Sequence, residues 1–174
     1  MTMELFTFPY LDEFYGEAEA ARAKRRRLEQ MASLLPWIAS MDAFQHWLYA
    51  NPHHTRDERD AYWIQLHERF TAAVSWEGLE QYRRMGWQRV GHFYGAPFYM
   101  IEYGIAQLGA LQLWLQFKQD RPRAMENYRR ALTLGGSRPL PELFEVAELT
   151  FDFGPDTMKR LMEEVQKELE TLPL

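Results

Sequence analysis

A histidine and several tyrosines near the middle of the chain are the residues best suited to chemistry. His92 and Tyr94 begin the stretch GHFYGAPFYMIEYGIAQ, residues 91 to 107, and Tyr99 and Tyr103 follow within it. Tyr99 and Tyr103 are four residues apart, a spacing that places both on one face of a helix. Phenol and imidazole groups donate hydrogen bonds, and donors fixed where negative charge develops stabilise a transition state.

The same spacing also fits a structural role. Tyr99 and Tyr103 can be core aromatics whose hydroxyls meet backbone carbonyls, and His92 can be a hydrogen-bonded loop histidine. The alternative is a helix that lines a cleft, because Ala106 and Ala110 would let another group approach the same side closely. From spacing alone, the structural role is favoured.

Other motifs that carry chemistry are missing from the sequence. The five histidines include no His-x-x-x-His pair and there is no cysteine, so we predict no metal site within this chain. Asp42 and His46 lie four residues apart, which predicts an ordinary hydrogen bond. No glycine-rich phosphate loop and no Gly-x-Ser-x-Gly elbow is present.

Helical patterns fill the chain, and the absence of an alternating strand pattern predicts an all-α fold. One helix is predicted from about Leu11 to Leu35, where Pro36 ends or kinks it, and a second from Pro36 to the residue before Pro52. Thr55 and Glu58 have the spacing of a capping box and predict the next start. Later in the chain, four prolines can each begin a helix: Pro97, Pro122, Pro141 and Pro155. The pair Gly135–Gly136 can end one.

The helix expected after Pro97 is apolar on all sides, which predicts a buried core helix. A membrane span is the competing interpretation. Polar side chains within the run argue against it: Glu102, Gln107, Gln112 and Gln116.

Composition predicts a single helical domain over residues 1–174. The chain is 47% hydrophobic and carries a net charge of −5, which supports a packed core and argues against general nucleic-acid affinity. Its basic cluster, Arg22 with Lys24–Arg27, lies among acidic residues and reads as a solvated helix face. The N-terminus has no basic region typical of a signal peptide, and the lack of cysteine favours the cytoplasm.

Three long stretches resemble the oligoendopeptidase F family of zinc metallopeptidases, relatives of thimet oligopeptidase. They are MTMELFTFPYLDEFY at the start, LPWIASMDAFQHWLYANPHHTRDER at residues 35 to 59, and GHFYGAPFYMIEYGIAQLGALQLW at residues 91 to 114. The resemblance implies zinc as the cofactor of the complete enzyme, held by a His-Glu-x-x-His helix and a further glutamate. This chain contains none of these ligands, so the resemblance implies the C-terminal part of a catalytic domain.

The resemblance also implies roles for residues of this chain. In the family, a histidine and tyrosines of the matching region face the zinc across the cleft and bind the substrate and the oxyanion. Carried over, they are His92, Tyr103 and Tyr99, with Tyr94 as a weaker substrate-binding candidate.

We therefore expect a segment of an endopeptidase for short peptides, inactive by itself and completed by a missing N-terminal part. The alternatives are a non-catalytic helical module that binds peptides and a chain that self-associates through its uncovered surface.

Overall fold

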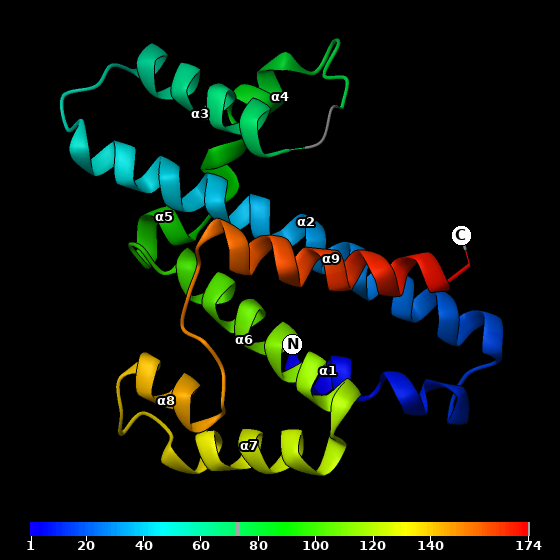
Figure 1. Ribbon diagram of the computed structural model, residues 1–174. Helices are drawn as coiled ribbons and strands as arrows, with labels where there is room; N and C mark the ends of the chain where they lie inside the picture. The colour runs from blue at the N-terminus through cyan, green and yellow to red at the C-terminus, as the bar shows by residue number, and fades with distance from the viewer. Residues whose placement is uncertain (72–73, 174) are drawn as a thin grey trace. The chain divides into compact units, whose positions relative to one another are not determined.

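The computed structural model describes residues 1–71 and 74–173, and every regular element in this part of the chain is a helix (Figure 1). The predicted all-α class is confirmed. In chain order the helices are α1 (Thr2–Phe6), η1 (Phe8–Glu13), α2 (Glu17–Ala50), α3 (Arg56–Phe70), α4 (Glu80–Arg84), η2 (Gly86–Arg89), α5 (His92–Gly95), α6 (Met100–Gln119), α7 (Arg121–Leu134), α8 (Leu140–Val146) and α9 (Pro155–Thr171).

The helices form two compact units. One unit consists of Met1–Ala32 together with the chain from Ile105 onward, and the other is Ser33–Gly104. We call them the terminal unit and the central unit. Both boundaries fall inside helices, α2 and α6, so each of these helices contributes a segment to each unit.

Helix α2 runs through Pro36, where the sequence predicts the end of one helix and the start of another. A proline inside a helix removes one backbone hydrogen bond and costs about 3 kcal/mol. Ile38 and Met41, just after Pro36, are buried, and burial of each such side chain contributes about 1.5–3 kcal/mol. Packing therefore offsets the cost of the proline. The start also differs from the prediction, because Leu11 belongs to η1 and α2 begins at Glu17.

The predicted capping box at the start of α3 is confirmed. The Thr55 hydroxyl accepts a hydrogen bond from the Glu58 backbone N–H at 3.2 Å, and the Glu58 carboxylate accepts one from the Thr55 N–H at 2.8 Å. These bonds satisfy donors that the first turn of a helix otherwise leaves free. Helix α3 then carries Trp63 and Leu66 into the core.

Most of the other predicted helix starts and ends agree with the structure. Pro155 is the first residue of α9, while Pro122 and Pro141 lie in the first turns of α7 and α8. Helix α7 ends before Gly135, whose φ of 53° lies in the left-handed region that glycine tolerates best.

Aromatic rings fill the core of the central unit. Phe44 of α2 packs on Trp63 of α3, with ring centroids 5.2 Å apart, and on Trp87 of η2 at 5.7 Å. The buried Asp60 accepts hydrogen bonds from the Trp87 indole at 3.2 Å and from Arg84 at 2.8 Å. This carboxylate therefore ties α4 and η2 to α3.

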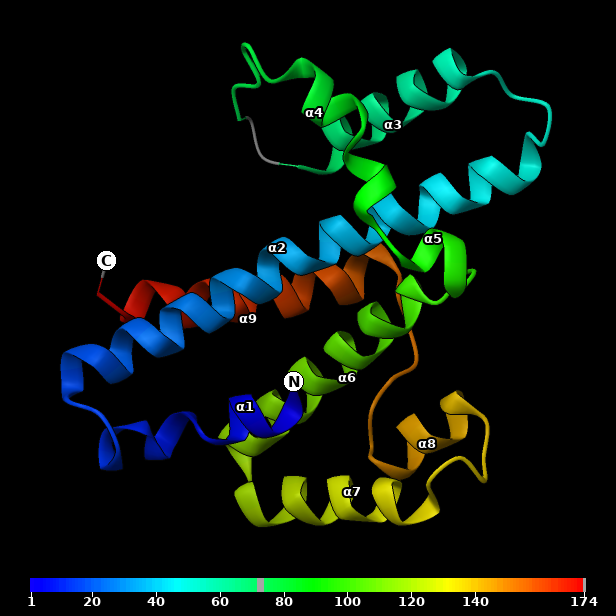
Figure 2. The same ribbon diagram turned by 180° about the vertical axis from the view of Figure 1, so that it is seen from behind.

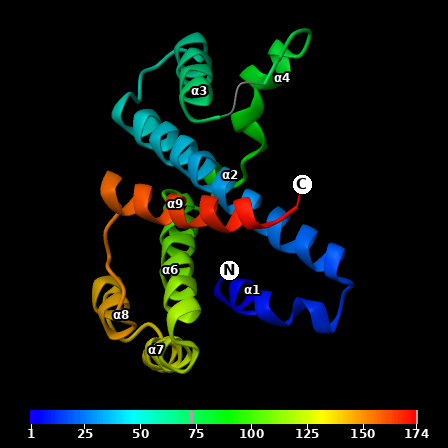
Figure 3. The ribbon, with the colours of Figure 1, turned by 45° about the vertical axis from the view of Figure 1, so that its right-hand side comes forward.

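The terminal unit is held by polar side chains of α6 as well as by its apolar core. Phe6 stacks on Phe117 at 4.3 Å. The Gln112 amide donates to the Thr150 carbonyl at 3.0 Å and accepts from the Thr150 N–H at 2.9 Å, which fixes the segment before α9. Gln116 donates to the Glu148 carbonyl at 2.8 Å. Figure 3 shows α6, α7 and α8 following one another in this unit.

Helix α6 is buried along Gln107–Trp114, as expected for a core helix, although its first turns are more open and Ile101 is exposed. No helix in residues 1–71 and 74–173 combines the length and the apolar character needed to cross a membrane.

The basic cluster of α2 makes contacts within the terminal unit in addition to facing solvent. Lys24 pairs with Asp12 of η1, and Arg27 pairs with Glu4 of α1. Arg25 donates to the backbone carbonyls of Leu169 at 2.9 Å and of Leu172 at 2.6 Å, at the end of α9. Figure 2 shows the end of α9 beside the N-terminal half of α2. A cation there satisfies free carbonyls and complements the helix dipole.

We expect Thr55→Ala to lower the free energy of unfolding by about 1 kcal/mol, because it removes the side-chain acceptor of the cap. Urea unfolding followed by circular dichroism measures the change. Ser137→Ala is the control, since the exposed Ser137 side chain makes no hydrogen bond in the described part of the chain. Equal stability of the Thr55 variant and the parent would contradict the role of the cap.

We expect Arg25→Gln to lower the free energy of unfolding by about 1.5–3 kcal/mol, the range for hydrogen bonds from a charged group. The matched control is Arg26→Gln, which removes the same charge from an exposed neighbour without a hydrogen bond or ion pair among the described residues. Urea unfolding of both variants distinguishes the loss of the Arg25 hydrogen bonds from the loss of a positive charge. An equal loss in both would show that charge alone is responsible.

Candidate functional site

His92 and Tyr103 form the centre of a polar cluster in the central unit. His92 is the first residue of the short helix α5, and Tyr103 lies in the first turn of α6. The His92 Nε2 and the Tyr103 hydroxyl oxygen are 3.2 Å apart, a hydrogen bond whose direction depends on the histidine tautomer. The two rings are perpendicular, with centroids 5.6 Å apart.

Tyr99 completes the cluster from the residue before α6. Its ring lies parallel to the His92 ring at 5.9 Å and perpendicular to the Tyr103 ring at 5.5 Å. The Tyr99 side chain is 48% exposed, and its hydroxyl has no hydrogen-bond partner within residues 1–71 and 74–173. His92, Tyr99 and Tyr103, here called the His–Tyr cluster, are thus brought together.

A bent loop between His92 and Tyr103 sets the spacing of this cluster. The prediction that Pro97 begins a helix is wrong, because α6 begins at Met100. Phe98 has a φ of 58°, a left-handed conformation that is costly for a residue with a side chain. Its N–H donates to the Gln45 side-chain oxygen at 2.8 Å, and its ring packs 4.9 Å from Tyr49. These contacts to α2 compensate for the strained backbone.

Asp42 and His46 lie beside this loop on α2. The Asp42 carboxylate oxygen and the His46 Nε2 atom are 3.5 Å apart, so the two side chains are neighbours as the spacing predicts, but the predicted hydrogen bond is not formed in the described part of the chain. The His46 ring also contacts the Phe98 ring at 4.9 Å. Neither residue joins a larger set of ligands, since the described residues contain no group of three or more His, Cys, Asp or Glu side chains arranged to hold a metal ion.

Tyr94 faces a different neighbour from the other candidates. Its ring lies 6.5 Å from that of Trp87, and 62% of its side chain is exposed. No ring contact or hydrogen bond joins it to the His–Tyr cluster in the described part of the chain. Its role in substrate binding remains a prediction.

The His–Tyr cluster offers donors rather than a nucleophile. If His92 donates to the Tyr103 oxygen, the Tyr103 hydroxyl hydrogen is free for a bound group, and the Tyr99 hydroxyl is available as well. Such donors can hold a carbonyl oxygen or a developing oxyanion. The described residues do not supply a ligand set that fits zinc.

Two residues that position the cluster carry no signal in the sequence. Gln45 is a single amide in a helical stretch, and Phe98 reads as an ordinary apolar residue. Only the packing of α2 against the loop shows that the Gln45 side chain accepts a hydrogen bond from the Phe98 backbone N–H.

The chain belongs to peptidase family M3, because the model of this family matches residues 1–163. That range includes the helices from α1 to α8, the first part of α9 and the whole His–Tyr cluster. The expected family relationship is confirmed.

Known proteins of similar sequence and structure agree with this assignment. An oligoendopeptidase F homologue of Borreliella burgdorferi is 39% identical over 56 residues, which are 32% of this chain and 9% of that protein. The structure of Pz peptidase A with an inhibitor matches 98% of this chain at 30% identity, with a TM-score of 0.90. An X-ray structure described as oligoendopeptidase F matches 98% at 33% identity, with a TM-score of 0.86.

A third structure, described as an oligoendopeptidase F from Bacillus anthracis str. Ames, matches 98% of this chain at 30% identity with a TM-score of 0.76. The chain spans only 27% to 30% of the length of these three structures.

We expect Tyr103→Phe to lower the free energy of unfolding by about 1 kcal/mol, because it removes a hydroxyl that bonds to His92 and keeps the ring. Tyr99→Phe is the matched control, since the hydroxyl it removes has no described partner. Its expected effect is within about 0.5 kcal/mol. Urea unfolding of both variants checks the difference, and equal losses would contradict the His92–Tyr103 bond.

Proposed function

We propose that this chain provides the substrate-binding wall of a zinc metalloendopeptidase that cleaves short peptides. The observation that carries the proposal is the His–Tyr cluster, in which His92 and Tyr103 are 3.2 Å apart in a chain of peptidase family M3. In this role the hydroxyls of Tyr103 and Tyr99 donate to the oxyanion, and His92 orients Tyr103. Tyr94 contacts the substrate beyond the cluster.

The proposed metal and general base belong to another part of the complete enzyme. A His-Glu-x-x-His motif is missing from the sequence, so the isolated chain is expected to be inactive. The proposed compartment is the cytoplasm, where a chain without cysteine has no need of oxidising conditions. Because the family match spans both compact units, we treat residues 1–174 as parts of one domain.

The proposed partner is the remainder of a family-length chain. Large apolar side chains are exposed in the α1–η1 region of the terminal unit and the turn that follows, and Phe14 is 77% exposed. Exposed apolar surface of this kind marks an interaction site. Since the chain covers about a third or less of its structural neighbours, the missing remainder is the occupant favoured over a second copy. The exposed residues are Met3, Tyr10, Phe14 and Tyr15.

The proposal is tested by co-expressing this chain with the part of an oligoendopeptidase F that it does not cover. We expect zinc-dependent cleavage of an internally quenched short peptide by the mixture and none by either part alone. His92→Ala and Tyr103→Phe should each lower kcat about 10²- to 10³-fold, because each loses an oxyanion donor or its orientation.

Tyr128→Phe is the control for this assay, because Tyr128 belongs to the terminal unit and not to the cluster. Its kcat should equal that of the parent. A stable complex that never cleaves any peptide would contradict the catalytic proposal. Full activity of the Tyr103 variant would contradict the role of the cluster.

A non-catalytic peptide-binding module is the second candidate, favoured by the exposed and unpaired Tyr99 hydroxyl. Peptide binding by this chain alone, weakened by His92→Ala, would support it. Isothermal titration with short peptides makes that measurement, and gel filtration with light scattering reports any self-association. An isolated chain that binds no short peptide would exclude the module.

A further inference from the structure

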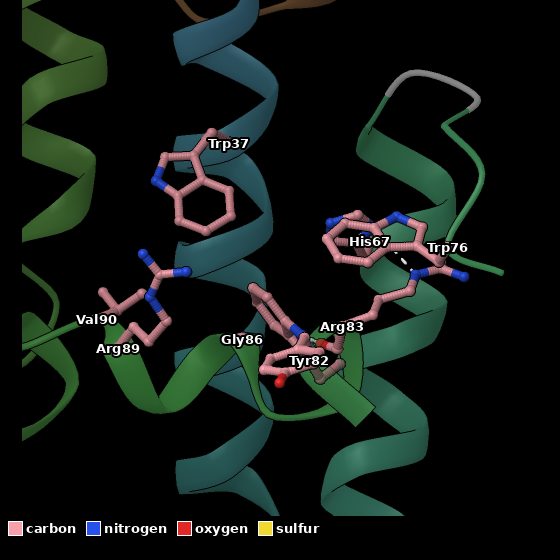
Figure 4. Close-up of a pocket in the computed structure, with 9 residues that line it drawn as sticks. Trp37, His67, Trp76, Tyr82, Arg83, Gly86, Arg89 and Val90 are labelled. Carbon is pink, nitrogen blue, oxygen red and sulfur yellow. Dashed lines mark hydrogen bonds between the residues drawn. The ribbon is translucent and has the colours of Figure 1, made fainter. Parts of the chain in front are cut away.

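The central unit contains a pocket that is separate from the His–Tyr cluster. It has a volume of about 370 Å³ and lies between α2, α3 and the α4–η2 segment (Figure 4). This size suits one or two fused rings with a short polar group. Its lining includes Trp37, Trp63, His67, Trp76, Tyr82 and Arg89.

Aromatic rings form the walls of this pocket. Trp63 is buried and fixed by a hydrogen bond from its indole N–H to the Arg83 carbonyl at 2.9 Å, and Trp37 packs edge-on against it at 6.1 Å. Trp76 meets the His67 ring at 5.4 Å. Tyr82 is 72% exposed, so its ring is free to cover a ligand. Such walls favour a flat aromatic group.

The charge left unpaired in the pocket is the guanidinium of Arg89. Arg83 already pairs with Glu68 at 3.3 Å and donates to the Nδ1 atom of His67 at 3.4 Å. Burial, together with the positive charge of Arg83, lowers the pKa of His67, so this imidazole is neutral near pH 7. Arg89 is exposed and has no hydrogen bond or ion pair within residues 1–71 and 74–173.

We propose that this pocket binds an aromatic carboxylate, with the ring between Trp37, Trp76 and Tyr82 and the carboxylate on Arg89. Arginine binds carboxylates with two parallel hydrogen bonds. One free arginine, with Arg83 already paired to Glu68, suits a monoanion better than a phosphate. The ligand is either the C-terminal aromatic residue of a peptide or a free aromatic acid. This site is independent of the proposed catalysis.

Titration of residues 1–174 with N-acetyl-tryptophan, followed by NMR of the tryptophan indole N–H signals, tests the proposal. We expect saturable shifts for Trp37 and Trp76 and none for Trp114, which lies in the terminal unit. N-acetyl-tryptophan amide, which lacks the carboxylate, should bind about tenfold more weakly. No saturable shift at millimolar concentration, or equal affinity for acid and amide, would overturn the proposal.

Two further ligands distinguish a peptide C-terminus from a free aromatic acid as the source of the bound carboxylate. Ala-Ala-Trp presents a peptide C-terminus, and indole-3-acetate presents a free aromatic acid. Tighter binding of the tripeptide assigns the pocket to peptide ends, and tighter or equal binding of indole-3-acetate assigns it to free acids. Each result supports an aromatic carboxylate site, whereas binding of neither ligand argues against it.

Matched variants locate the contacts. Arg89→Gln and Tyr82→Ala should each weaken N-acetyl-tryptophan binding about tenfold, and both side chains are exposed, so the fold should persist. Arg26→Gln makes the same change as Arg89→Gln on an exposed residue of the terminal unit and should leave affinity unchanged. Unchanged affinity in Arg89→Gln would refute the assigned contact. An unchanged Trp114 signal serves as the folding check.

Discussion

The His–Tyr cluster depends on the hydrogen bond between the Gln45 side chain and the Phe98 backbone N–H. This 2.8 Å bond connects α2 to the loop that separates His92 from Tyr103. Gln45 is only 1% exposed, so its oxygen would be a costly unpaired acceptor without this partner. Phe98 adopts a left-handed backbone conformation at this point. The loop therefore has one well-defined path, and α6 begins where Tyr103 can reach His92.

The same principle operates in both compact units, where buried polar groups fix segments that short apolar elements would hold loosely. Asp60 binds Trp87 and Arg84 in the central unit, and Gln112 binds both backbone groups of Thr150 in the terminal unit. A hydrogen bond in a low-dielectric interior is directional, and its loss leaves an unpaired group. Asp60 thus determines where α4 and η2, which line the pocket beside Arg89, lie in the central unit. Gln112 determines where the segment before α9 lies in the terminal unit.

Local signals in the sequence predict local structure well and fail where distant packing intervenes. The Thr55–Glu58 cap and the helix end before Gly135 rest on residues within a few positions of each other, and both are confirmed. Pro36 and Pro97 read locally as helix boundaries. At Pro36, the burial of Ile38 and Met41 keeps α2 intact. After Pro97, the contact of Phe98 with α2 shifts the start of α6 to Met100.

The sequence by itself determined the helical class, several helix boundaries and the family relationship, and it proposed the side chains of the candidate site. Backbone propensity, capping and apolar periodicity act over a few residues, which makes them readable along the chain. Only the tertiary structure decided that His92 pairs with Tyr103, that Tyr94 turns to Trp87, and that aromatic residues from several helices enclose a pocket beside Arg89. Those partners come from different elements, and their meeting depends on how the chain packs and not on residue spacing.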